Sequence, residues 1–274
     1  MYLPAILAIL TVIFLAFLPD MRRATRSRIS RRSASDFRNY EVPVEPSNAE
    51  FFAEMVNILT NEFPFYKKLS DNEKRLFAER TYYIRISKEF YGMENMVLNA
   101  KHETMISATL TQLTFGLHRY YDLPSFEMIQ VYPEVFYSRL VENHVKGLTL
   151  GNGRIFLSWK DFETGHSDDD DKIHVGLHEF AHAMMIEFDQ FRYVNPWRTW
   201  KSHAATLMPE LISNDDHFFR QYGATNIHEF WAVSVETFFE QPKEFRTKYP
   251  EFYDATAAML NQDLCARLEI FEHI

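Results

Sequence analysis

Two histidines and a glutamate within residues 178–182 have the types and spacing of a metal-binding, water-activating helix. In this His-Glu-Phe-Ala-His segment, His178 and His182 are four residues apart, so on a helix they share one face and both imidazoles can bind one Zn²⁺ ion. Glu179 lies beside that face, where its carboxylate can reach a metal-bound water and remove a proton from it. The pattern predicts His178 and His182 as zinc ligands and Glu179 as the catalytic general base.

A catalytic zinc ion needs a third protein ligand, and residues 222–232 are the candidate segment. This segment is turn-rich and leads into an apolar helix, where the Glu229 carboxylate is costly unless something binds it. Glu236, seven residues later on the same face, is a candidate for orienting a ligand from behind. His228 is the alternative third ligand. On a helix its side chain points about 100° away from that of Glu229, so only one of the two can face the metal.

Three further features have simpler interpretations. His174, four residues before His178, is a candidate for supporting a ligand, but a surface histidine is the favoured interpretation. Cys265 is the single cysteine of the chain, which excludes a cysteine-rich zinc site, and we expect it to be a core thiol. The acidic run at residues 168–171 precedes the motif helix and is interpreted as its solvated cap rather than as a calcium loop.

The motif and the sequence downstream of it resemble the Mlc titration factor A family of zinc-dependent peptidases, whose active site is distantly similar to that of the lethal factor toxin protease. The resemblance rests on HEFAH at residues 178–182, on Tyr222 followed by the EFWAVSVETFF run that begins at Glu229, and on the later Pro242, and it covers about residues 60–262. It implies that Glu229 is the third ligand of one Zn²⁺ per chain. It also implies that Tyr222 is a catalytic residue that donates a hydrogen bond to the developing oxyanion.

The resemblance also carries implications for the substrate and for a partner. In related metallopeptidases an edge strand binds the peptide backbone of the substrate, and residues 155–159 are the candidate for that strand. The partner of the family is a glucose-responsive repressor, which makes a transcriptional regulator a candidate partner beside a peptide or protein substrate. The chain departs from the family in its N-terminal segment and in residues 190–219.

The elements that must position these residues belong to an α+β, zincin-like metallopeptidase domain that is mostly helical with a small mixed sheet. Apolar residues at helical spacing predict helices in residues 51–59, 70–77 and 104–117, and residues 129–132 and 147–159 predict a strand and a strand pair that turns at Asn152-Gly153. From residue 172 to the end the pattern is helical, with breaks at Asn195-Pro196 and Gln241-Pro242.

Ahead of this domain, which we place at residues 48–274, the sequence predicts a membrane anchor and a basic linker at residues 21–47. Residues 3–18 carry no charge and reach roughly 24 Å as a helix, close to a bilayer core of about 30 Å. Six arginines and no acid follow in residues 21–32, so the positive-inside bias predicts a single transmembrane helix at residues 1–20 of the inner (cytoplasmic) membrane, with the catalytic domain facing the cytoplasm. The alternatives are a cleaved signal and a buried or interfacial helix. A cleaved signal requires Lys or Arg before the apolar run, and none precedes it here.

Composition limits the remaining function classes. A hydrophobic fraction of 46% supports a folded core, and a formal charge of -9 argues against nucleic-acid binding. The chain contains no glycine-rich nucleotide-binding pattern and no serine-hydrolase elbow. The sequence therefore predicts a zinc metallopeptidase that hydrolyses peptide bonds with a metal-activated water and a glutamate base. The alternative is a regulatory protein that sequesters a transcriptional repressor or a membrane partner, with zinc in a structural role.

Overall fold

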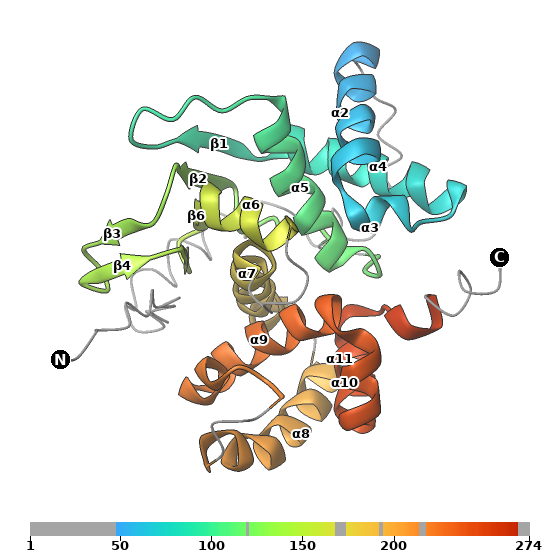
Figure 1. Cartoon of the computed structure of the whole chain (residues 1–274), viewed down its shortest axis with the longest axis vertical. Coiled ribbons are helices and arrows are strands. Elements are labelled where there is room, and N and C mark those ends of the chain that lie inside the picture. Colours follow the sequence, from blue (N-terminus) through green and yellow to red (C-terminus); the bar gives the residue numbers. More distant parts are fainter. Residues whose placement is uncertain (1–47, 119–120, 168–173, 192–193, 214–217, 268–274) are drawn as a thin grey trace.

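Helices dominate the fold and pack against a small four-stranded mixed sheet, which is the α+β architecture that the sequence predicts (Figure 1). The structure is a computed structural model that describes residues 48–118, 121–167, 174–191, 194–213 and 218–267. The predicted anchor at residues 1–20, the basic linker at 21–47 and the acidic run at 168–171 lie outside the described residues. Within the described ranges, no helix is both long and apolar enough to cross a bilayer.

The sheet has the strand order β1-β2-β6-β5 among the described residues. Its strands are β1 (Glu89–Gly92), β2 (Met128–Tyr132), β6 (Arg154–Ser158) and β5 (Gly147–Leu150). The first three run parallel, and β5 pairs antiparallel with β6 across the predicted turn. Gly153 closes this turn with a φ of 88°, and a Cβ there would lie 2.5 Å from the Ser125 carbonyl oxygen, so the position requires glycine.

The prediction that residues 155–159 form an edge strand is wrong. These residues lie in β6, which pairs with β2 on one side and with β5 on the other, and Trp159 already begins a helix. Among the described residues, the edge strand beside the motif helix is β5. A hairpin sequence predicts that two strands pair with each other, but it does not indicate which of the two also pairs with a distant strand such as β2.

The N-terminal helices are α2 (Ala49–Glu62), α3 (Pro64–Lys67), α4 (Asp71–Ser87) and α5 (Ala100–Thr114). The predicted start of a helix after Ser70 is confirmed, because Ser70 and Glu73 form a capping box. The helix predicted at residues 104–117 begins and ends earlier, since Asn99 caps α5 and accepts a hydrogen bond from the His102 backbone N–H. These helices pack on one another, and α5 also contacts α7, the helix of the motif.

The C-terminal part is helical, as predicted, and it provides both helices of the site. Its elements are α6 (Trp159–Ser167), α7 (Val175–Phe191), α8 (Val194–Ser213), the short 3-10 helix η1 (Gln221–Thr225), α9 (Ile227–Glu240), α10 (Pro242–Lys248) and α11 (Pro250–Leu260). The break at Gln241-Pro242 is confirmed, because Pro242 begins α10 directly after α9 ends. Between β2 and β5, strands β3 (Phe136–Ser138) and β4 (Asn143–Val145) form a separate hairpin.

Packing fixes α7 between the sheet and α9 (Figure 1). Trp231 of α9 is fully buried and donates its indole N–H to the Ala181 carbonyl of α7, with 2.9 Å between the two atoms. An aromatic cluster also supports α9, in which the Trp200 ring contacts those of Trp231, Phe230 and Phe252. This apolar packing fixes the position of α9, and with it the residues that α9 turns toward α7.

Candidate metal centre

Helix α7 presents the two histidines of the motif in a buried position. The apolar residues at helical spacing, Leu177, Ala181, Met184, Met185 and Phe188, are all buried against the sheet and the neighbouring helices. This packing orients the remaining face of α7 toward α9. His178 and His182 lie on that face with 0% and 2% of their surface exposed, and their Nε2 atoms are 3.1 Å apart.

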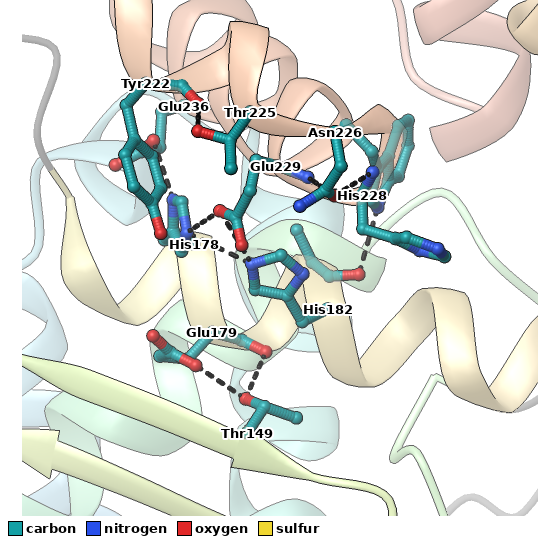
Figure 2. Close-up of polar contacts among 12 residues, drawn as sticks. Thr149, His178, Glu179, His182, Tyr222, Thr225, Asn226, His228, Glu229 and Glu236 are labelled. Atoms are coloured by element: carbon teal, nitrogen blue, oxygen red, sulfur yellow. Dashed lines mark hydrogen bonds and ion pairs between the residues drawn. The ribbon is translucent and has the colours of Figure 1, made fainter. Parts of the chain in front are cut away.

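Helix α9 brings a carboxylate to the same point. Asn226 caps the helix, and its side-chain oxygen accepts the backbone N–H groups of His228 and Glu229 at 2.9 and 3.1 Å. This cap fixes the first turn, from which Glu229 points at the two histidines (Figure 2). Its Oε2 atom lies 3.2 Å from His178 Nε2 and 3.5 Å from His182 Nε2.

The spacing of these three atoms fits a single metal ion. In a tetrahedral zinc site with bonds of about 2.0 to 2.1 Å, neighbouring ligand atoms lie about 3.3 Å apart. The observed separations of 3.1, 3.2 and 3.5 Å match that value. Two imidazoles and one carboxylate are also the donor set of known catalytic zinc sites. The cluster can therefore hold a metal ion.

Glu236, one of the predicted supporting residues, fixes the orientation of His178. Its carboxylate accepts three N–H groups, from His178 Nδ1 at 3.0 Å, from the His174 backbone at 2.9 Å and from the Arg220 guanidinium. Because Nδ1 donates to Glu236, the neutral His178 ring presents the lone pair of Nε2 to the centre. A carboxylate behind a histidine also makes that histidine a stronger ligand.

The electrostatics of the cluster favour a positive charge at its centre. Burial lowers the pKa of the His178 imidazole, but the carboxylates of Glu236 and Glu229 outweigh burial and raise it to about 10. For Glu229, burial raises the pKa of the carboxyl, and the histidines His182 and His178 outweigh it and lower that pKa below its ordinary value. The two buried carboxylates thus attract a cation, which a proton or a metal ion can supply.

Glu179 points away from Glu229, toward the sheet (Figure 2). Its Oε2 atom accepts a hydrogen bond from the Thr149 hydroxyl of β5 at 2.7 Å, while Oε1 has no hydrogen-bond partner among the described residues. Burial raises the pKa of the Glu179 carboxyl to about 8. A carboxyl group with a raised pKa beside a metal centre is suited to exchanging protons near neutral pH.

Tyr222 lies beside the cluster, next to His178 and Glu229 (Figure 2). It is half-buried, and its ring centroid is 6.0 Å from that of His178. Burial and the nearby carboxylates of Glu229 and Glu179 raise the pKa of the phenol. The hydroxyl therefore keeps its proton at neutral pH and can serve as a hydrogen-bond donor.

Two other histidines considered from the sequence, His228 and His174, do not contribute a ring nitrogen to the cluster. His228 points away from the cluster, and its Nδ1 atom lies 2.7 Å from the Met185 sulfur (Figure 2). The prediction of a surface position for His174 is wrong: it is 5% exposed and its ring packs on His166, with 4.3 Å between the ring centroids. Its backbone N–H supports Glu236. Cys265 is buried, as expected of a core thiol.

Sequence reasoning missed two residues that contact the site, Thr149 and Arg220. Thr149 lies in the predicted hairpin, where the alternation of strand residues indicates which side chains share a face but not which helix covers that face. Arg220 lies directly ahead of the segment that contains Tyr222, and its partner Glu236 is 16 residues later, a separation that no local spacing rule pairs. Both contacts depend on tertiary packing.

Two buried histidines on an HExxH helix, facing a carboxylate from a second helix, are the arrangement typical of a metallopeptidase. The family model of the glucose-regulated metallo-peptidases M90 matches residues 37–260. The chain belongs to this family, which is the Mlc titration factor A family that the motifs resemble. It is also similar to an uncharacterized protein of Synechocystis sp., with 27% identity over 220 residues that cover 72% of this chain and 79% of the relative.

Proposed function

We propose that the protein is a zinc-dependent peptidase that uses His178, His182 and Glu229 as its metal ligands. The observation that carries the proposal is the convergence of three buried ligand atoms at tetrahedral spacing, with Glu236 fixing the tautomer of His178. Membership of a metallopeptidase family supports the reaction class. The nitrogen-rich donor set favours zinc over calcium or magnesium, because those ions prefer sites made of oxygen ligands.

When bound, zinc supplies Lewis acidity that polarises the peptide carbonyl and lowers the pKa of water. Glu179 is the general base. Its Oε2 atom is engaged by Thr149, so Oε1 accepts the proton of the attacking water and later returns it to the leaving amine nitrogen. The raised pKa of this carboxyl suits both transfers.

Tyr222 stabilises the negative charge that develops on the carbonyl oxygen of the substrate. Its hydroxyl is neutral and half-buried beside the ligand Glu229, and it has a proton to donate. Such a donor contributes mainly when charge develops in the transition state.

The substrate backbone pairs with β5 rather than with β6. Strand β5 is one of the two edge strands of the sheet among the described residues, it lies against α7, and its Thr149 already contacts Glu179. An extended peptide can add to such an edge through backbone hydrogen bonds. Pairing along β5 would bring the scissile bond next to the catalytic base.

The proposal is tested with full-length protein, one equivalent of zinc and a library of fluorogenic peptides. We expect hydrolysis that stops when a chelator removes the metal and that returns when zinc is restored. Glu179→Gln should bind zinc as the wild type does and lose nearly all hydrolysis. A metal-loaded Glu179→Gln variant with full activity would contradict the assigned base, and a chelator-resistant wild type would contradict metal dependence.

A further inference from the structure

Strand β5 contacts the proposed catalytic base through two residues that face α7. We propose that Thr149 and Gly147 position the Glu179 carboxylate, Thr149 through a hydrogen bond and Gly147 by leaving space for it. Thr149 is thus a positioning residue of the peptidase reaction. The inference rests on the proposed function and adds to it a structural origin for the orientation of the base.

The Thr149 hydroxyl is held between two oxygens of the same residue. Its Oγ1 atom lies 2.7 Å from Oε2 of the Glu179 side chain and 3.0 Å from the Glu179 backbone carbonyl oxygen. Thr149 is 1% exposed and Glu179 is fully buried, so both contacts are shielded from bulk solvent. A buried hydrogen bond to a carboxylate is stronger than one between neutral groups, and here it ties the side chain of α7 to β5.

Gly147 supplies the space that this conformation needs. It lies two residues before Thr149, so the two residues share the strand face that is turned toward α7. A Cβ at position 147 would lie 2.5 Å from Glu179 Oε1 and 2.6 Å from Glu179 Cγ. No larger residue fits there unless the Glu179 side chain moves. The glycine is therefore required by close approach.

Thr149 and Gly147 give the two oxygens of the Glu179 carboxylate different surroundings. Thr149 engages Oε2, and Oε1 lies beside Gly147 without a hydrogen-bond partner among the described residues. This leaves Oε1 to receive the proton. Since β5 is also the proposed docking edge for the substrate, one strand sets both the register of the peptide and the position of the base.

The test compares Thr149→Val, which removes the hydroxyl at nearly constant volume, with Thr149→Ser, which keeps it. In full-length, zinc-loaded protein, we expect Thr149→Val to lower kcat by about 10- to 100-fold, the range for one hydrogen bond to a charged group, with KM within about threefold of the wild type. Thr149→Ser should retain kcat within about threefold. Thr114→Val is the matched control, because the buried Thr114 hydroxyl likewise lies near two oxygens, here the backbone carbonyls of Leu110 and Tyr121, away from the site.

A full kcat in metal-loaded Thr149→Val would overturn the inference, and so would a Thr149→Ser variant as impaired as Thr149→Val. Crystal structures give a readout that does not depend on activity. We expect the Glu179 carboxylate to rotate away from β5 in Thr149→Val and to be displaced in Gly147→Ala, but to keep its place in Thr149→Ser. An unmoved carboxylate in Thr149→Val would refute the positioning role. A wild type that hydrolyses no peptide would instead contradict the proposed function and leave this crystallographic comparison decisive.

Discussion

Replacing Glu236 by glutamine should weaken zinc binding without touching any ligand atom. The two oxygens of the Glu236 carboxylate accept three N–H groups, from His178, from the His174 backbone and from Arg220. An amide has a single oxygen, and its NH₂ group donates. In either orientation of the glutamine, at least one of these buried donors therefore loses its acceptor.

The expected loss is about 10- to 100-fold in zinc affinity, which corresponds to about 1.4 to 2.7 kcal/mol. Two effects contribute. The His178 ring is no longer held with its Nε2 lone pair toward the centre, and the positive Arg220 side chain loses its anionic partner. The assay is a competition titration of full-length protein against a chromophoric chelator at pH 7.5.

Glu187→Gln is the control, because it makes the same change in a fully buried carboxylate of α7 that accepts the Ser125 backbone N–H and contacts no ligand. We expect its zinc affinity to equal that of the wild type. Equal affinities for wild type and Glu236→Gln would refute the role of Glu236. An equal loss in both variants would indicate a general effect of destabilisation instead.

Three further predictions concern neighbouring residues. Burial raises the pKa of Glu187 to about 7, and a raised carboxyl pKa means stability that is present at low pH and lost as the pH rises through 7. Urea titrations in the presence of a chelator should therefore show the free energy of unfolding of the wild type falling by about 3 kcal/mol relative to that of Glu187→Gln between pH 4 and pH 8. Parallel pH profiles of the two proteins would contradict the assigned role of Glu187. Tyr222→Phe should keep its zinc and lose about 100-fold in kcat, and an unchanged kcat would exclude Tyr222 as the oxyanion donor. His228→Ala should keep both zinc and activity, whereas His182→Ala should lose the metal; zinc loss in His228→Ala would contradict the assigned ligand set.

The parts of the site that depend on local spacing could be predicted from the sequence. His178 and His182 share a helix face because they are four residues apart, and this relation holds for any helix that contains them. For the third ligand, local spacing left both Glu229 and His228 open, and the choice of Glu229 came from the family resemblance; the structure adds that Asn226 caps this helix. The structure brings His178, His182 and Glu229 together across 51 residues of chain.

The parts that depend on the pairing of distant segments could not be predicted. Strand β5 rather than β6 lies at an edge of the sheet because β6 also pairs with β2. Since β2 and β6 are distant in the sequence, no local pattern predicts that they pair. The contact of Thr149 with Glu179 follows from this strand order. Strand β1, with the short sequence Glu-Phe-Tyr-Gly, has no alternation that distinguishes it from a loop. The membrane anchor at residues 1–20 stays a prediction from the sequence.

The most direct test of the metal centre is an anomalous difference map at the zinc edge, from crystals of the full-length protein grown with one equivalent of zinc. The geometry predicts one strong peak, bonded to His178 Nε2, His182 Nε2 and Glu229 at about 2.0 to 2.2 Å. A peak elsewhere in the molecule, or a zinc ion that His228 binds in place of Glu229, would contradict the proposed site.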